Sequence, residues 1–317
     1  MHIKSILKKT LALILSLSVC LTLFAGCTKS ENGAPTVILA YQGGIGYAPF
    51  HIVEKSRLIE KHFGKEVNVV FKKLDSGVAI NEGITGGKID VGGMGLAPAI
   101  SVIAAGMPCK IFTGLCAQPN SLFTNKSNIK SLADIKKQDK IAIVKEGSVQ
   151  HIFLSMAAKK YLGDAHALDE NIQSMSHAEG MAALESGTVA LHLTTMPFLA
   201  KEREQQGITE LDVISQVWSK DNTFLVATAS EEFKNKNPEL FAAVDAAFKE
   251  AIEIVNSGSD EVAEIESEYL SLEKETVKKY LTYDGCKFFA EVAGGEEMTK
   301  FMYDEGFITN YPDKLEF

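Results

Sequence analysis

One segment of the chain occurs twice, and this repetition constrains the fold more than any other feature. Residues 87–98 can be aligned with residues 187–197. In each copy a helix-like segment stops at a glycine, a short apolar run follows, and a proline stands at or near the start of the next helix. Proline suits the first helical turn, where its missing N–H costs nothing. Two copies of one unit predict two lobes of similar build, although any α/β protein contains units of this general kind.

Strand-like and helix-like segments alternate on both sides of this repeat. The expected strands are residues 37–41, 67–74, 88–92, 110–115, 140–144, 189–193 and 222–228. The expected helices are residues 48–62, 76–86, 97–105 and 149–161, a helix opening at Ser131, one opening at Ser176 and a long one from Ser230 to Val255. Such alternation predicts an α/β fold built from βαβ units, with a mainly parallel sheet.

Residues 1–26 have the features of a secretory signal. Three lysines and no acidic residue precede an apolar run over residues 11–24, and two small residues end the segment. The run is shorter than the roughly 20 residues that a transmembrane helix needs. A basic start, a short apolar run and small residues before a cleavage point predict export from the cytoplasm.

Cys27 directly follows Ala25 and Gly26, a sequence that resembles the lipobox of bacterial lipoproteins. The resemblance implies a diacylated Cys27, a polar tether over residues 27–35 and a protein held by lipid on the extracytoplasmic face of the cell membrane. The tether is too poor in apolar residues to pack. An ordinary secretory signal with an incidental Cys27 is the alternative.

The charge and the cysteine content limit which partners, disulfides and metal sites the sequence predicts. The formal net charge is −9, and removal of residues 1–26 makes it more negative, so no electrostatic footprint for nucleic acid is present. Cys109 and Cys116 stand at the two ends of one expected strand, too far apart for a disulfide. With Cys286 they are expected to be small buried side chains. No Cys/His spacing is typical of zinc, and no metal or cofactor is predicted.

Four strand-to-helix turns are the candidate binding elements, at residues 42–47, 93–97, 147–150 and 194–196. Ligands of such sheets bind beyond the carboxyl ends of the strands, where helix N-termini offer free N–H groups and a positive dipole end. A small polar or anionic solute suits these groups. The predicted ligand-binding residues are Gln42, Gly44, Tyr47, Gly95, Leu96, Ser148, Gln150, His151, Thr194, Thr195 and Phe224.

Catalytic signatures are not found in the sequence. The glycines of residues 43–46 lack G-x-G-x-x-G spacing, and neither a P-loop nor a G-x-S-x-G motif occurs. Ser148 and His151 have nucleophile-and-base spacing, but no third group orients them and Ser148 is expected to cap a helix. No catalytic residue is predicted. Both arginines, Arg57 and Arg203, lie outside the four turns, which disfavours a tightly held dianion.

Several motifs in their order resemble the nitrate/sulfonate/taurine family of ABC-transporter solute-binding proteins, which also includes binders of thiamine-pyrimidine precursors. The matching stretches are GYAPFHIVEK at residues 46–55, GKIDVG at 87–92, SLADI at 131–135, GSVQH at 147–151 and MAALESG at 181–187. The resemblance covers about residues 37–241. Ala190 and residues 194–197 differ from the pattern of many relatives, so the solute stays open.

The resemblance implies a type II periplasmic-binding-protein fold, with two α/β lobes joined by two crossover segments and the ligand between them. The expected ranges are residues 36–118 and 223–317 for the first lobe and 119–222 for the second. The expected function is a non-enzymatic, monomeric capture protein that delivers a small-molecule solute to an ABC permease and its ATPase. Alternatives are uptake of a thiamine-pyrimidine precursor and ligand sensing for a membrane receptor. The pyrimidine synthases of this fold carry a cysteine-rich motif that is missing here.

Overall fold

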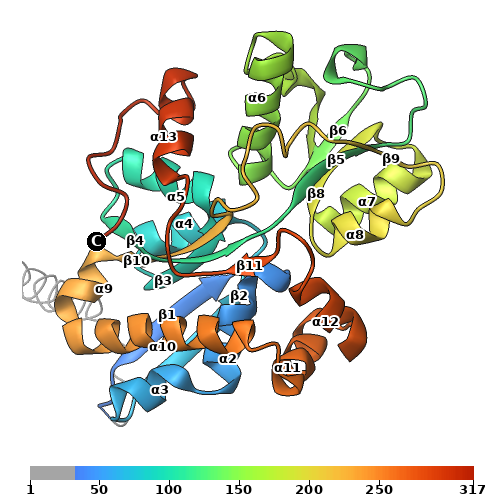
Figure 1. Cartoon of the computed structure of the whole chain (residues 1–317). Coiled ribbons are helices and arrows are strands. Elements are labelled where there is room, and N and C mark those ends of the chain that lie inside the picture. The colour runs from blue at the N-terminus through green and yellow to red at the C-terminus, as the bar shows by residue number, and fades with distance from the viewer. Residues whose placement is uncertain (1–32) are drawn as a thin grey trace, which may run out of the picture. The chain divides into compact units, whose positions relative to one another are not determined.

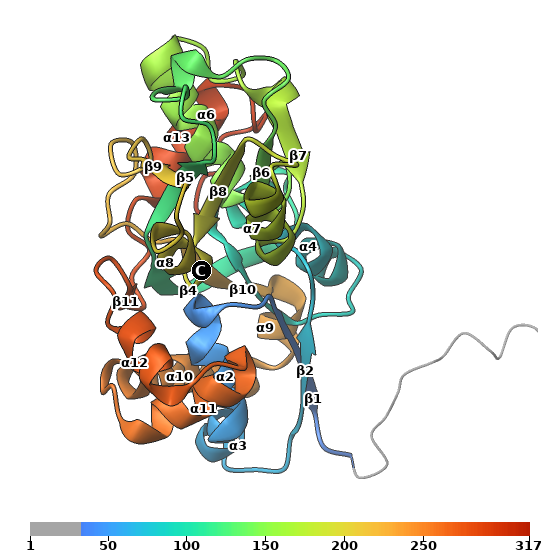
Figure 2. The same cartoon turned by 90° about the vertical axis from the view of Figure 1, so that its right-hand side faces the viewer.

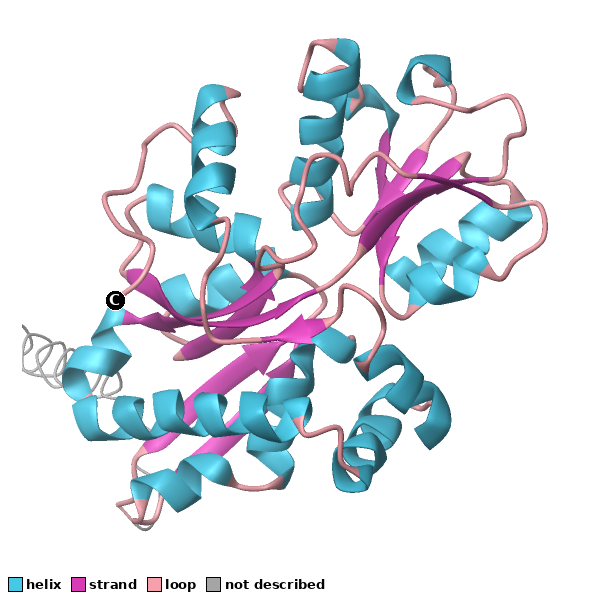
Figure 3. Ribbon diagram, in the orientation of Figure 1, coloured by secondary structure: helices cyan, strands magenta, loops and turns pink. Residues whose placement is uncertain are grey.

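The strands of the chain form two separate sheets, shown in magenta in Figure 3. The first sheet has the order β11-β4-β10-β3-β1-β2, and the second has the order β7-β6-β8-β5-β9. The computed structural model describes residues 33–317, so the predicted signal, Cys27 and most of the tether lie outside the described residues.

The strand bounds show that the two sheets draw on different parts of the chain. The first sheet contains β1 (Thr36–Tyr41), β2 (Asn68–Lys73), β3 (Val91–Gly95), β4 (Cys109–Ala117), β10 (Leu225–Ser230) and β11 (Lys287–Phe288). The second sheet contains β5 (Asn120–Thr124), β6 (Ile141–Ile143), β7 (Ile172–Ser174), β8 (Leu191–Thr195) and β9 (Thr209–Leu211).

Both sheets share one topology, as the internal repeat predicted. β3 pairs parallel with β1 in the first sheet, and β8 pairs parallel with β6 in the second. Beside β3 runs the antiparallel strand β10, and beside β8 runs the antiparallel strand β5. β3 and β8 are the two strands of the repeated segment. The prediction of two α/β lobes is therefore confirmed. The expectation of a mainly parallel sheet is wrong, because β10 pairs antiparallel with β3 and β4, and β5 pairs antiparallel with β8 and β9.

Helices cover both faces of the first sheet, with α10, α2 and α3 on one side and α4 and α5 on the other (Figure 1). The second sheet lies between α6 and the pair α7 and α8 (Figure 2). The helix bounds are α2 (Ala48–Lys55), α3 (Leu58–Phe63), α4 (Gly77–Thr85), α5 (Leu96–Ala104), α6 (Val149–Leu162), α7 (His177–Ser186), α8 (Phe198–Arg203), α9 (Glu231–Lys236), α10 (Pro238–Asn256), α11 (Asp260–Leu270), α12 (Lys274–Leu281) and α13 (Gly295–Asp304). None of these helices combines the length and the hydropathy needed to cross a membrane.

The chain passes between the sheets at two places. Gln118 and Pro119 join β4 to β5, and residues 212–224 join β9 to β10. We call these the first and second crossover. Both overlap the crossover segments that the family resemblance implies, near residues 116–124 and 219–224, while the residue ranges of the lobes stay a prediction.

Two expected helices are broken in the structure. The expected helix over residues 48–62 divides into α2 and α3 because Arg57 adopts a left-handed backbone, with φ of 51°. The long helix from Ser230 is interrupted at Asn237, which precedes a proline and leaves helical geometry. Ser131 opens only a 3₁₀ turn, although its capping box with Asp134 is present.

Local capping signals in the sequence are confirmed. The hydroxyl oxygens of Ser148, Ser176 and Ser230 each accept a hydrogen bond from a backbone N–H in the first turn of the following helix. Such a bond satisfies one of the four N–H groups that a helix start leaves unpaired. Cys109 and Cys116 both lie within β4, and both are free and buried, as expected.

Candidate functional site

The first predicted turn is closed by a bond between two of its predicted residues. The amide Nε2 of Gln42 donates to the hydroxyl of Tyr47 at 2.7 Å, and Tyr47 is buried, which raises the pKa of its phenol. Gly44 between them has φ of 126°, a region that only glycine enters readily. At Gly46 a Cβ atom would collide with Leu225, so the backbone lies directly against the strand β10.

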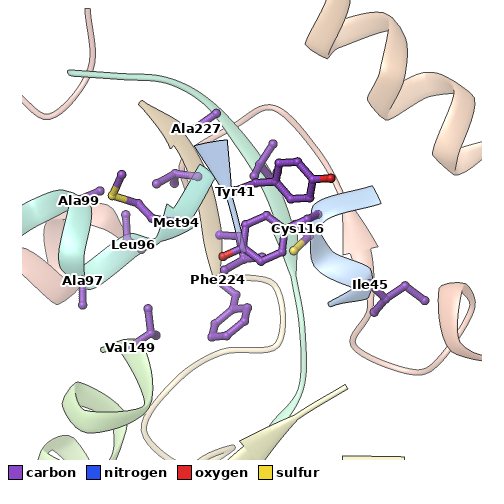
Figure 4. Packing of buried hydrophobic residues seen from close by; sticks show 14 of the residues in the cluster. Tyr41, Ile45, Met94, Leu96, Ala97, Ala99, Cys116, Val149, Phe224 and Ala227 are labelled. Atoms are coloured by element: carbon purple, nitrogen blue, oxygen red, sulfur yellow. The ribbon is translucent and has the colours of Figure 1, made fainter. Parts of the chain in front are cut away.

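The second and third turns meet across the two lobes. The side chain of Val149, at the start of α6, fills the space that a Cβ atom on Gly95 would need. Figure 4 shows Val149 facing the start of α5, with Phe224 beside them. The N–H of Leu96 donates to the carbonyl of Phe224 at 3.0 Å, so the second crossover also contacts the start of α5.

Ser148 and His151 are engaged within their own helix start. Ser148 Oγ accepts from the N–H of His151 at 3.3 Å, and the N–H of Gly147 donates to His151 Nδ1 at 3.0 Å. His151 Nε2 lies 3.3 Å from a carboxylate oxygen of Asp169, and the imidazole meets Phe307 edge-on. These partners occupy both ring nitrogens, so a ligand contact by His151 stays a prediction that this geometry does not favour.

Two of the predicted ligand-binding residues, Thr195 and Gln150, form hydrogen bonds in and beside the first crossover. Thr195 Oγ1 donates to the carbonyl of Pro119 at 2.8 Å and to Gln118 Oε1 at 3.3 Å. Gln150 Nε2 donates to Asn120 Oδ1 at 3.3 Å. The crossover therefore brings residues of β8 and α6 into one polar cluster.

A chain of hydrogen bonds that runs through the half-buried His177 continues this cluster away from the crossover. Thr194 Oγ1 lies 3.2 Å from His177 Nδ1, and Gln150 Nε2 lies 3.5 Å from His177 Nε2. His177 Nδ1 lies 3.3 Å from His192 Nε2, and His192 Nδ1 lies 2.6 Å from Glu202 Oε1. The cluster therefore ends at a carboxyl group with no exposed surface.

Burial sets the charge state of this chain. It lowers the pKa of His177 and of His192 to about 3, and it raises the pKa of Glu202 to about 8, with a further contribution from Glu185. At neutral pH the two imidazoles and the carboxyl group are therefore uncharged. The chain presents His177 to Gln150 and Thr194 as a neutral hydrogen-bonding group.

A cavity of about 340 Å³ lies between the two crossovers, and we call it the hinge cavity. It is lined by Gln118, Pro119, Asn120, Ser121, Phe153, Arg203, Glu210, Asp212, Ile214, Ser215, Trp218, Ser219, Lys220, Tyr283, Asp284 and Gly285. None of the residues predicted to bind ligand is in this set. Gln118 and Asn120 link it to the predicted site, because they also bond Thr195 and Gln150.

The hinge cavity combines paired charges with an aromatic wall. Arg203 donates to both carboxylate oxygens of Glu210 and to the hydroxyl of Tyr283. Lys220 Nζ lies 3.0 Å from a carboxylate oxygen of Asp284. The aromatic wall consists of Phe153 and Trp218, whose ring centroids are 5.3 Å apart, with Phe224 6.3 Å from Phe153.

The predicted site residues thus fall into four groups rather than one. Gln42 and Tyr47 form a pair at the first turn, with Gly44 between them. Gly95, Leu96 and Phe224 meet Val149. Ser148 and His151 belong to the start of α6. Gln150, Thr194 and Thr195 share the polar cluster of the first crossover.

Sequence reasoning missed several polar residues around the site. Gln118 and Asn120 flank a proline in the crossover that the resemblance indicated, and this position was the available signal. Trp218 is the only tryptophan of the chain. His192 is a polar residue inside an apolar strand, and such a residue needs a buried partner. Among residues 33–317 no group of three or more His, Cys, Asp or Glu side chains is arranged to hold a metal ion.

Comparison with known proteins identifies relatives of the whole chain. The model of the NMT1-like family matches residues 30–270. A protein of Escherichia coli (strain K12) named for the binding of aliphatic sulfonates is 26% identical over 316 residues, which is 95% of this chain and 92% of that protein. These matches confirm the family resemblance drawn from the sequence motifs.

Solved structures share the fold. The periplasmic aliphatic sulphonate binding protein SsuA from Escherichia coli has a TM-score of 0.68 and 22% identity, covering 88% of this chain and 95% of that chain. The MOPS-bound alkanesulfonate-binding protein SsuA from Xanthomonas axonopodis pv. citri has a TM-score of 0.70 and 16% identity, covering 87% and 96%. The periplasmic nitrate-binding protein NrtA from Synechocystis PCC 6803 has a TM-score of 0.63 and 17% identity, covering 78% and 69%.

Proposed function

Because this chain belongs to the NMT1-like family, we propose that it is the solute-binding component of an ABC importer and captures a small polar organic solute between its two lobes. The relatives compared above are binding proteins by name, and one of them is matched over 92% of its length. In such a protein the ligand stabilises the closed arrangement of the lobes, and no catalytic group is needed.

The observation that carries this proposal is the position of the polar residues around the crossovers. Gln118 of the first crossover lines the hinge cavity and accepts from Thr195 of the second sheet, and its amide lies against Gly46 of the first turn. A solute held here touches both lobes and the segments that join them. Solute binding is then coupled to the opening and closing of the lobes.

The proposal also includes where the protein is located and which proteins it works with. Acylation of Cys27 holds the body on the extracytoplasmic face of the cell membrane through the tether of residues 27–35. The lobes work as a monomer and deliver the solute to a permease with its ATPase. Replacing Cys27 with Ala is expected to move the protein from the membrane fraction to the soluble fraction of fractionated cells. Retention in the membrane fraction would count against the anchor.

A thermal-shift screen of the full chain in mild detergent tests solute capture. The screen compares sulfonates, oxyanions, small carboxylates and pyrimidines, with solutes present at 1 mM. A ligand at 100 times its Kd stabilises the folded protein by about 2.7 kcal/mol, which gives a clear rise in the melting temperature. A rise with one chemical class supports capture. A flat response across all classes, with no small molecule released from the purified protein on denaturation, contradicts it.

A further inference from the structure

We infer that the captured solute carries no negative charge, has a flat apolar ring and hydrogen-bond acceptor atoms, and is not a sulfonate or nitrate. This inference rests on the proposed function and specifies its substrate class. Three features of the hinge cavity support it: unpaired hydrogen-bond donors, an aromatic wall and charged side chains that are paired with one another. The hydrogen bonds already made at nearby helix starts are a fourth observation.

Two buried N–H donors of the hinge cavity lack an acceptor. Within residues 33–317, neither Gln118 Nε2 nor Trp218 Nε1 has a hydrogen-bond partner, although both side chains line the cavity and each residue is only 6% exposed. Buried donors in native proteins are nearly always paired, so each of these calls for an acceptor atom. A carbonyl oxygen or ring nitrogen of a solute supplies it.

The cavity wall beside these donors is aromatic. Trp218 and Phe153 lie with ring centroids 5.3 Å apart at an interplanar angle of 37°, and Ile214 adds an aliphatic side chain. Trp218 thus presents an apolar ring and a polar N–H to the same space. Aromatic walls with a few placed donors are typical of sites for compact organic ligands.

The charged side chains around the hinge cavity are already committed to one another. Arg203 is paired with Glu210, and Lys220 is paired with Asp284. Asp212 is the fifth charged residue of the lining, so the carboxylates outnumber the cations. An anion brought here meets a net negative surrounding and no unpaired cation of the lining.

At two nearby helix starts, one backbone N–H each is already bonded within the protein. The N–H of Leu96 at the start of α5 donates to the second crossover, and the N–H of His151 in α6 donates to Ser148. The N–H of Gly147 donates to the His151 ring. Lys73 lies against Gly43 at the first turn, but it is an exposed residue of β2. Lys73 is not part of the hinge-cavity lining, and this gives the experiment a control.

Calorimetric titration of the full chain in mild detergent separates the two solute classes. The uncharged probes are uracil, thymine and nicotinamide, and the anionic probes are methanesulfonate, taurine and nitrate. At least one uncharged ring is expected to bind with a Kd in the micromolar range. Trp218→Phe keeps the ring and removes the N–H, and Gln118→Met keeps the length and removes the amide. Each variant is expected to weaken binding about tenfold.

A thermal readout separates this role from a structural one. Trp218→Phe removes a buried donor that has no partner in the ligand-free protein, so its melting temperature is expected to stay unchanged or to rise while binding falls. Lys73→Ala is expected to leave binding of the ring unchanged. A structural role of Trp218 would instead lower the melting temperature and the affinity together.

Three outcomes would overturn the inference. They are binding of methanesulfonate, taurine or nitrate in place of the rings, ring affinity unchanged in both variants, and binding of neither class. The first outcome leaves the proposed function intact. In the third case, extraction and mass spectrometry of the protein purified from its native host decide whether the proposed function fails as well, since a capture protein releases its solute on denaturation.

Discussion

Val149 of the second lobe occupies the space that a side chain on Gly95 of the first lobe would need. Gly95 has φ of −65°, so alanine is free of backbone strain there, and the collision with Val149 is the cost of the substitution. Gly95→Ala is therefore expected to oppose closure of the lobes. Overpacking costs about 1–3 kcal/mol, which weakens solute binding roughly 5- to 150-fold. Calorimetry with the best solute of the screen measures the loss.

A compensating substitution distinguishes closure from general damage. Val149→Ala removes the methyl groups that collide with the new Cβ, so the double variant is expected to recover most of the affinity that Gly95→Ala loses. Equal affinity of the single and double variants would show that the two residues are not coupled in the bound state.

Ser148 is expected to matter for stability more than for ligand contact. Its hydroxyl caps α6, and replacing a capping serine with alanine costs about 1 kcal/mol. Urea unfolding of Ser148→Ala measures this cost. Ser176→Ala, which removes the capping hydroxyl of α7, is the matched control for the loss of a cap. Weaker solute binding in Ser148→Ala but not in Ser176→Ala would assign Ser148 a ligand contact after all.

Glu202 makes stability depend on pH between about 4.5 and 8. Its pKa of about 8 in the folded protein lies above its usual value of 4.5, so the folded state holds a proton that the unfolded state has released. Stability from this group is complete below pH 4.5 and is lost as the pH rises toward 8, at up to about 1.4 kcal/mol per pH unit. Unfolding free energies at pH 6.5 and pH 8.5 measure the effect. Glu202→Gln, which has no proton to lose, is expected to abolish this difference.

His192 and His177 act in the opposite direction at low pH. Their folded pKa values of about 3 lie below the usual 6.5, so the unfolded state binds protons more readily. Stability from these neutral imidazoles is present above pH 6.5 and falls as the pH drops toward 3. Unfolding followed from pH 7 to pH 4 is expected to show this fall. His177→Gln should make it shallower, and an unchanged slope would mean that the pKa of His177 is not lowered in the folded protein.

Phe307 connects the C-terminal segment to α6 and is expected to slow solute release. Its ring meets His151 edge-on and lies 4.8 Å from the ring of His166. Loss of aromatic pairing costs about 0.5–1.5 kcal/mol, so Phe307→Ala should raise the dissociation rate about 2- to 10-fold. Stopped-flow measurement tests this. Tyr303→Ala is the control, because Tyr303 is exposed and pairs with Tyr311 of its own segment.

The order of the strands β1, β2, β3, β4, β6, β8 and β10 could be predicted from the sequence because it depends on local patterns, whereas β5, β7, β9 and β11 were not predicted. The strands β3 and β8 begin at Val91 and Leu191, within the repeated segment. The N-caps predicted at Ser148, Ser176 and Ser230 are confirmed, because an N-cap depends only on the first turn of its helix. The bounds of β3, β8 and β10 were shifted by two or three residues, since burial of one sheet against its helices, and not local pattern, decides where pairing ends.

The sequence could not predict which site residues lie together, because this depends on contacts between distant segments of the chain. Nothing near Gly95 indicates that Val149 would fill the space beside it, or that Phe224 would accept from the next residue. Glu202 reads as an ordinary surface carboxylate of an amphipathic helix, and only its contact with His192 makes it a buried acid. The four turns were identified correctly as elements, while their partners in the crossovers required the tertiary structure.

The position of β10 has a consequence for how the protein acquires its fold. β10 lies between β3 and β4 in the first sheet, yet it follows the whole of the second sheet in the chain. A polypeptide that emerges from its N-terminus can complete the second sheet once residue 211 is available, whereas the first sheet lacks an inner strand until residue 230 appears. The lobe that begins first therefore finishes last. Until then β3 and β4 expose unpaired edges, which makes this interval the aggregation-prone stage of biogenesis.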